Sequence, residues 1–541
     1  MFKLVTRPRI RPRHLLLPIA GALILAAVLY WLVAGAQSEL PTGPNACTTL
    51  GCGEYAKRLH ATVNRSANPC QSFTRFVCSG WNHNNPWSVR EDYFRLALSR
   101  LNRTLHKVKW PSRGQNEEQR AAAVYQSCDD VFQGKTDQLP AVKTALAEAG
   151  ISVADITATV THINLTESRW LETLEKLNVS ARSPFLLTTQ LRYVQAVFGL
   201  WEAFGEDSFH VLVSWWTVQI AALYANRDLI LNVYYPYPEF ADVYHVAFCV
   251  GRAAYFSSHA VFARHSREIV KGGVEDVARK LVLTVRRAFL RRLLRWNSAD
   301  VDVTSITNWT SLSVAFRSFD YLNGTEIVES GPIPGMTRSF VHNWKHSVLI
   351  KRTLDSESLL AAIDYLLTQF FVVNEHDSQL LPYALSYPLF DLDLPAAVNY
   401  GGLGADVGNG LAVFLLHGLA SANSSIRNSF LECMSQTLLT HGLGTWGTWM
   451  GYIYQAVMFG ALIDAYKESD FGVYLPLPGF EGYNGLQTLF LSQCYTWCGG
   501  SHDGAGEFRC DIYLQHVPEF AEAFNCSKGD PMYPGHQCKL F

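Results

Sequence analysis

Residues 47–81 read CTTLGCGEYAKRLHATVNRSANPCQSFTRFVCSGW, and residues 494–500 read CYTWCGG. These two stretches near opposite ends of the chain hold six of its 12 cysteines. An even and high cysteine count is typical of a protein that folds in an oxidising compartment and is stabilised by disulfides. The residues alone do not fix which cysteines pair.

The chain between and around these stretches is long enough for a large body. It has 541 residues, of which 48% are hydrophobic, so we expect more than one ordinary small domain and a two-lobed globular ectodomain. The formal net charge is -2 and only 17% of the residues are charged. This charge balance argues against a nucleic-acid partner.

Basic residues followed by an apolar run open the chain. The basic residues are Lys3, Arg7, Arg9, Arg11 and Arg13. Residues 15–36 are uncharged, and at roughly 1.5 Å per residue a helix of this length crosses the ~30 Å hydrocarbon layer. We therefore predict a transmembrane signal-anchor at 15–36, a cytoplasmic tail at 1–14 and a linker at 37–46. The alternative is a cleaved signal peptide ending at residues 34–36, which would give a secreted protein.

Glycosylation sequons support an extracellular ectodomain. Eight Asn-x-Ser/Thr sequons follow the apolar run, and none precedes it. They lie at Asn64, Asn102, Asn164, Asn178, Asn308, Asn323, Asn423 and Asn525. The predicted place is the plasma membrane, as a single-pass type II protein.

Three segments predict helices. Residues 84–130 carry apolar side chains at helical spacing. Residues 437–463 contain no charged side chain, but their glycines favour a core helix after a Gly-rich turn over a second membrane span. Residues 281–296 place Val282, Val285, Phe289, Leu293 and Trp296 on one face and five arginines on the others. This pattern predicts an amphipathic helix with a solvated basic side, with an anion or lipid-headgroup site as the alternative.

Short motifs at both ends carry a resemblance to a known family. CTTLGC and NRSANPCQSFTRFVCSGW open the ectodomain, and CYTWCGG and PEFAEAFNCSKGDPMYPGHQCKLF close it. AVYQSC around Cys128, FLECMSQ around Cys433 and YALSYPLFDLDLPAAVNYGGLGADVG lie between them. In this order the motifs resemble the neprilysin and endothelin-converting enzyme family of zinc metallopeptidases.

The resemblance implies a fold and a division of the chain. The fold class would be mainly α (α+β), with two lobes, a zincin-like C-terminal lobe and a short sheet beside the zinc helix. Residues 47–360 would form a mostly helical N-terminal region and residues 361–541 the C-terminal zincin region. The chain is shorter than typical members, which implies that part of one lobe is missing.

The resemblance also implies a disulfide plan. The implied pairs are Cys47 with Cys52, Cys70 with Cys526, Cys78 with Cys498, Cys128 with Cys249, and Cys433 with Cys538. Parity then leaves Cys494 with Cys510.

The zinc site of the family does not carry over. The family binds zinc through the two histidines of an HExxH helix and a glutamate from a second helix, while an aspartate orients one histidine. Here Asn409 and Val413 stand at the two histidines and Gly410 at the catalytic glutamate. Gly451 stands at the glutamate ligand and Gln455 at the orienting aspartate. The substituted residues are neutral, which avoids unpaired buried charges, so we expect no metal and no cofactor.

The substrate-contact positions survive in part. Asn374 matches the asparagine that pairs with the substrate backbone, and Arg509 matches the arginine that binds a substrate carbonyl. Asp503 falls at the transition-state histidine, although a shift of one residue would restore it as His502.

We therefore expect a catalytically inactive homologue that binds a peptide or protein at the cell surface and is held to the membrane by its N-terminal anchor. The alternative is an active zinc metalloendopeptidase that takes part in proteolysis of extracellular peptides. A third interpretation, a truncated product that does not fold, agrees poorly with the even cysteine count.

Overall fold

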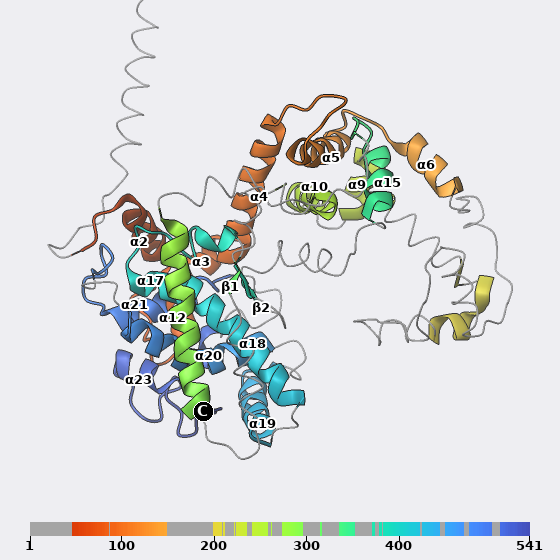
Figure 1. The fold of residues 1–541 in the computed structure, drawn as a ribbon. Helices are drawn as coiled ribbons and strands as arrows, with labels where there is room; N and C mark the ends of the chain where they lie inside the picture. Colours follow the sequence, from red (N-terminus) through yellow and green to blue (C-terminus); the bar gives the residue numbers. More distant parts are fainter. Residues whose placement is uncertain are drawn as a thin grey trace, which may run out of the picture.

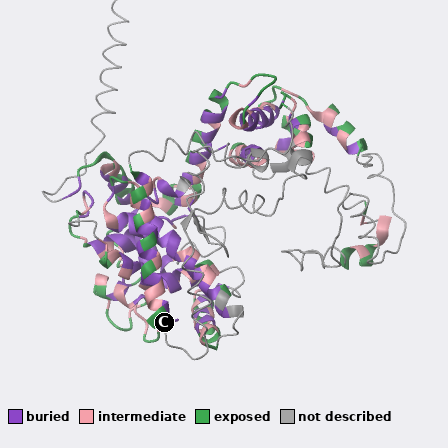
Figure 2. Ribbon diagram, viewed as in Figure 1, coloured by how far each residue is buried: buried purple, intermediate pink, exposed green. Residues whose placement is uncertain are grey.

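The computed structural model describes residues 46–85, 87–148, 199–207, 209–210, 221, 223–234, 241–257, 261, 273–295, 314–315, 335–351, 371–373, 378–380, 382–421, 425–443, 450–469, 475–499 and 509–540. Within these ranges the protein is mainly helical (Figure 1). Its buried residues gather into two large cores, which lie apart from each other in Figure 2.

The first core draws on the beginning, the middle and the end of the chain. Its helices are α2 (Leu50–Thr62), α3 (Phe73–Asn84), α12 (Val274–Arg295), α17 (Ala396–Asn399), α18 (Ala405–Ser421), α19 (Ser425–Thr440), α20 (Met450–Lys467), α21 (Gly485–Tyr495), α22 (Arg509–Leu514) and α23 (Pro518–Phe524). The predicted core helix within 437–463 is present as α20, and residues such as Ile453 and Ile463 are fully buried.

The second core is built from the part of the chain between α4 (Val89–Lys107) and α15 (Phe340–Lys351), apart from α12, which belongs to the first core. Its helices are α5 (Glu117–Phe132), α6 (Leu139–Glu148), α9 (Arg227–Tyr234), α10 (Ala241–Ser257) and α15 (Phe340–Lys351). The ring of Tyr224 stacks on Phe340 with centroids 5.0 Å apart and an interplanar angle of 14°. Cys128 of α5 is bonded to Cys249 of α10, so the disulfide joins two neighbouring helices of this core.

Helix α4 (Val89–Lys107) belongs to both cores. Ser88 caps it, accepting from the Glu91 backbone N–H at 3.1 Å while its own N–H donates to the Glu91 carboxylate at 2.7 Å. Val89 is buried in the first core, whereas Leu98, Leu101 and the following apolar positions are buried in the second. The helix predicted within 84–130 therefore forms the connection between the cores that Figure 1 shows.

A small sheet lies beside α18. Strand β3 (Ser378–Leu380) is central, with β1 (Val314–Ala315) parallel on one side and β2 (Phe371–Val373) antiparallel on the other. The β2 strand packs against α18, and the 3₁₀ turn η4 (Pro382–Leu385) follows β3. The sheet thus has the place that the resemblance implies.

The basic helix predicted at 281–296 is α12, and it is amphipathic as expected. Four of the five residues predicted on its apolar face, Val282, Val285, Phe289 and Leu293, are buried. The fifth, Trp296, lies outside the described residues. Its polar side is not simply solvated. Arg292 binds both carboxylate oxygens of Asp464 on α20, at 2.7 and 3.1 Å, and lies directly against Gly460. One arginine therefore fastens α12 to α20 in a bidentate pair.

All 12 cysteines are paired. The pairs are Cys47–Cys52, Cys70–Cys526, Cys78–Cys498, Cys128–Cys249, Cys433–Cys538 and Cys494–Cys510, the same six that the resemblance and parity imply. Two of them join α3 and the segment before it to the last part of the chain. The carboxylate of Asp511 on α22 adds to this connection, since it accepts from Ser72 at 2.6 Å and from the Thr74 backbone at 2.8 Å.

The cores do not divide the chain at residue 360. Residues 47–89 and α12 come before that position but contribute to the first core, together with the C-terminal helices. A boundary in sequence cannot show this arrangement, because the disulfides and α12 bring distant segments into one core.

Three of the eight predicted sequons are described. Asn64 and Asn525 are exposed, whereas Asn102 lies half-buried inside α4. The other five, at Asn164, Asn178, Asn308, Asn323 and Asn423, lie outside the described residues.

Among the helices that the structure describes, none is both long enough and apolar enough to span a membrane. The predicted anchor at 15–36, like the tail and nearly all of the linker, lies outside the described residues.

Candidate functional site

A widened helical turn introduces α18. The segment Tyr400–Gly404, labelled η5, is a π-helical turn. A side chain at Gly402 would overlap the carbonyl oxygen of Leu389, and one at Gly401 would come within 2.5 Å of the Leu489 carbonyl oxygen. The glycines of this motif are therefore required by close backbone packing. They fix where α18 starts and which side chains it presents to α20.

Helices α18 and α20 pack along each other. At Gly408 an added Cβ would lie 3.1 Å from the Cβ of Met458, so the absence of a side chain lets the two helices approach closely. Arg90 of α4 forms an ion pair with Asp406 in the first turn of α18, and its guanidinium lies 4.2 Å from the ring centroid of Trp497. The ion pair thus connects the first turn of α18 to α4.

The structure brings the predicted positions of the two helices together. Asn409, Gly410 and Val413 lie on α18 and are half-buried. Gln455 is buried on α20, and its side-chain N–H donates to the side-chain amide oxygen of Asn409 at 3.1 Å. Gly451 lies one turn earlier on α20, where an added Cβ would meet nothing within 4 Å.

A chain of hydrogen bonds extends from Asn409 into the first core. The amide oxygen of Gln455 accepts from the Gln493 side chain at 3.0 Å. The amide oxygen of Gln493 accepts in turn from the Tyr513 hydroxyl at 2.9 Å. Burial raises the pKa of Tyr513, so this chain of amides and one phenol is uncharged at neutral pH. We call the four residues Asn409, Gln455, Gln493 and Tyr513 the amide chain.

The amide chain offers little to a metal ion or a reaction. An uncharged amide is a weak ligand for zinc, and neither Val413 nor the two glycines has a donor atom in its side chain. Nor do these positions contain a group that titrates near pH 7 and could act as a general base.

The remaining predicted site residues are described only in part. Arg509 is half-buried at the first position of α22, next to Cys510, whose disulfide with Cys494 fixes the start of that helix. Asn374, His502 and Asp503 lie outside the described residues.

A separate cavity of about 500 Å³ lies at the other end of α20. Thr49, Leu281, Asn399, Tyr400 and Lys467 are among its lining residues. Lys467 ends α20 whereas Gly451 is near its start, so this cavity is distinct from the amide chain.

Comparisons with known proteins agree on one family. Residues 458–540 match the family model described as peptidase family M13. Neprilysin-1 of Caenorhabditis elegans is 29% identical over 199 residues, which is 29% of this chain and 26% of that protein. Neprilysin-21 of the same organism is 33% identical over 90 residues, 14% of this chain and 12% of that protein. The chain belongs to peptidase family M13.

The fold of this M13 member agrees with that of a solved relative. The crystal structure of the zinc metalloprotease ZMP1 of Mycobacterium tuberculosis in complex with an inhibitor covers 88% of this chain and 98% of its own, with a TM-score of 0.57 and 14% sequence identity. At this identity the likeness concerns the fold alone. In sequence, the chain spans about a quarter of the length of the first curated relative that it matches.

The family match begins just after Gln455. It therefore includes Asp464 and Arg509 but not Asn409, Gly410, Val413 or Gly451. The contact between Gln455 and Asn409 is an independent observation from the structure, because it joins the two positions that the resemblance assigns to the orienting aspartate and the first histidine.

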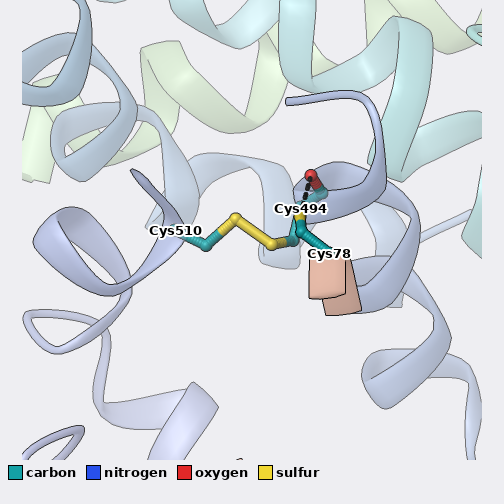
Figure 3. A group of neighbouring side chains, drawn as sticks. All are labelled: Cys78, Cys494 and Cys510. Carbon is teal, nitrogen blue, oxygen red and sulfur yellow. Dashed lines mark hydrogen bonds between the residues drawn. A yellow bond between two sulfur atoms is a disulfide. The ribbon is translucent and has the colours of Figure 1, made fainter. Parts of the chain in front are cut away.

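Two groups of cysteines in this M13 member come close enough to suggest a metal. Cys78, Cys494 and Cys510 form the first group, which Figure 3 shows, and Cys128, His245 and Cys249 form the second. Every sulfur in both groups belongs to a disulfide, and a disulfide lacks the thiolate that binds a metal. Both groups are thus structural.

Sequence reasoning missed one pair of histidines. HNWKH is an HxxxH motif, in which His342 and His346 have the four-residue spacing on α15 without the glutamate, so the expectation that the chain holds no HxxxH was wrong. The spacing itself was the signal. His245, by contrast, is fully buried between the rings of Phe132 and Phe248.

Proposed function

We propose that this M13 member is a catalytically inactive ectodomain that binds a peptide or a protein at the cell surface. The observation that carries the proposal is the hydrogen bond from Gln455 to Asn409, part of the amide chain. This bond supports the proposal because it joins two neutral amides at the positions that the resemblance assigns to the first histidine and its aspartate.

The residues present do not fit a zinc ion. A catalytic zinc site needs three protein ligands and one open position. At the positions that the resemblance assigns to the three ligands, Asn409 has an amide that already accepts a hydrogen bond. The side chain of Val413 is an isopropyl group, and that of Gly451 is a hydrogen atom. We therefore derive no hydrolytic step for this chain.

The binding part of the proposal rests on the substrate-contact positions. The resemblance assigns Arg509 to the arginine that binds a substrate carbonyl, and the span of the family match, residues 458–540, supports this assignment. An arginine at the first turn of a helix that is fixed by the Cys494–Cys510 disulfide is a pre-organised donor for a backbone carbonyl. Asn374 is the second contact in this proposal.

The location is also a proposal. The apolar run at 15–36 after five basic residues, together with the exposed sequon residues Asn64 and Asn525, supports a type II membrane protein with an extracellular C-terminal part.

Binding and catalysis can be tested on the same protein. The purified chain is incubated with a library of short peptides, with and without added zinc, and both cleavage and retention are measured. We expect retention of a peptide subset, no cleavage, and weaker retention by an Arg509→Ala variant. Arg113→Ala, which removes an exposed arginine from the loop before α5, serves as the matched control.

Three results would overturn the proposal. Peptide cleavage that a chelator abolishes would make the chain an active zinc metalloendopeptidase, the alternative function. Retention that Arg509→Ala and Arg113→Ala reduce equally would remove the assigned binding position. Absence of any retained peptide would remove the peptide-binding function.

A further inference from the structure

Helix α15 carries two histidines one turn apart on the second core. His342 is exposed and His346 is half-buried, and their ring centroids lie 4.2 Å apart with 52° between the ring planes. Residues four apart on a helix lie on the same face. Two imidazoles at this spacing and distance can bind one metal ion, as they do in the zinc helices of metallopeptidases.

The backbone under the two rings is held in place. Asn343, between them in sequence, is fully buried. Its amide oxygen accepts from the Thr337 backbone N–H at 2.7 Å, and its N–H group donates to the Ser127 hydroxyl of α5 at 2.9 Å. Phe340 is also fully buried. A helix fixed in this way presents the histidine pair without ordering a loop first, which favours binding.

The charges around the pair allow a cation. A neutral imidazole donates an electron pair to a metal ion through its unprotonated ring nitrogen, and neither ring of the pair is fully buried. The positive charge of Lys345 opposes the binding of a cation at the pair. It is partly compensated by Glu148 of α6, whose carboxylate lies 2.5 Å from the lysine nitrogen.

We propose that His342 and His346 form a surface site for Zn²⁺ or Cu²⁺. Imidazole nitrogen suits these borderline ions, whereas Ca²⁺ and Mg²⁺ prefer oxygen ligands. Two protein ligands leave coordination positions open for water or for a side chain of another molecule. The site lies on the second core, apart from the amide chain of the first core.

The test is a metal titration of the whole protein at pH 7.4. Zn²⁺, Cu²⁺ and Mg²⁺ are titrated separately by calorimetry into the parent and into His342→Ala, His346→Ala and the double variant. We expect one Zn²⁺ or Cu²⁺ per chain, no Mg²⁺, a weakening of about tenfold or more in each single variant, and no binding in the double variant.

A matched double variant separates this site from general histidine binding. His60→Ala with His83→Ala removes two exposed histidines from different helices of the first core, and it should bind metal like the parent. Circular dichroism and the melting temperature confirm the fold of each variant. Equal binding by the parent and the His342→Ala/His346→Ala variant would overturn the proposal, as would absence of binding in the parent.

This site changes how metal content relates to catalysis. If the His342→Ala/His346→Ala variant binds less zinc than the parent, the lost zinc was bound on α15. The proposal that the chain is catalytically inactive then stands. Zinc that this variant keeps, together with peptide cleavage, would reject the inactive assignment. The two proposals therefore fail on different results.

Discussion

Two helices of this protein carry the four-residue spacing of a zinc helix, and they differ in what occupies it. On α18 the spacing holds Asn409 and Val413 on a helix that packs against α20, and Asn409 is hydrogen-bonded into the amide chain. On α15 it holds His342 and His346 at the surface of the second core. The resemblance assigns the zinc helix to the first pair, whereas of these two pairs it is the second that has imidazoles. A spacing becomes a metal site only where donor atoms and their surroundings agree.

The largest expected effect comes from introducing the zinc-site residues of the family on α18 and α20. The variant combines Asn409→His, Gly410→Glu, Val413→His, Gly451→Glu and Gln455→Asp in the His342→Ala/His346→Ala background. We expect it to gain one zinc per chain, with affinity at least about 100-fold above its parent, because even the loss of a partner outside the ligand shell costs a zinc site about 10- to 100-fold.

Metal content after dialysis and calorimetric titration measure this gain. The open space at Gly451 leaves room for the glutamate. If the variant is folded but binds no zinc, the five positions do not converge on one site and the alignment of α18 with the zinc helix is wrong.

Disulfide removal tests whether the two helices sit in independent cores. Cys78→Ser with Cys498→Ser affects the first core, and Cys128→Ser with Cys249→Ser affects the second. Each pair should cost about 2–5 kcal/mol of stability. Hydrogen exchange should rise mainly in α21 for the first variant and in α10 for the second. A uniform rise across both helices in either variant would show that the cores unfold as one unit.

Acid provides a second comparison, because each core contains one buried neutral histidine. Burial lowers the pKa of His516 in the C-terminal part and of His245 in the second core to about 4. The unfolded chain binds these protons near pH 6.5, so their contribution to stability is complete above that pH and is lost as the pH falls toward 4. Each should account for about 2–3 kcal/mol between pH 7.5 and pH 4.5.

Urea unfolding at the two pH values measures this loss. His516→Gln and His245→Phe should each reduce the acid-induced loss of stability. The His516 ring accepts from the Cys538 backbone N–H at 3.1 Å, an interaction that protonation would break. A loss of stability that is the same in the parent and in both variants would assign the acid sensitivity to other groups.

The smallest expected effect concerns the amide chain itself. Gln455→Leu leaves the amides of Asn409 and Gln493 without their partner, which should cost about 1–3 kcal/mol in the free energy of unfolding. Gln133→Leu, a change at an exposed position, should stay within about 0.5 kcal/mol of the parent. Equal effects of the two substitutions would show that the amide chain does not stabilise the fold.

Much of the fold followed from the sequence, for identifiable reasons. The helical class, a core helix within 437–463 and the six disulfide pairs were expected. Five of the pairs were implied by the resemblance of the motifs around their cysteines, and the sixth, Cys494 with Cys510, by parity. The shared role of α4 could not be predicted, because an apolar stripe does not say which core buries it. The ion pair between Arg292 and Asp464 likewise depends on a contact between distant segments.

The site was predictable in its positions but not in its contacts. Asn409 and Gln455 could each be assigned from the resemblance, yet their hydrogen bond depends on how closely Gly408 lets α18 approach α20. The histidine pair on α15 was visible in the sequence as an HxxxH motif, and it was overlooked although no contact between distant segments is needed to find it.

Helix α4 has a consequence for communication across the molecule. Its first turn carries Arg90, which pairs with Asp406 at the start of α18, and its later turns pack on α5 and α10. Helix α15 packs on the same α5 and α10. Helix α4 therefore joins the packing of α5 and α10 to the ion pair at the first turn of α18. An event at the surface of α15 therefore has a continuous path of packed helices to the first turn of α18.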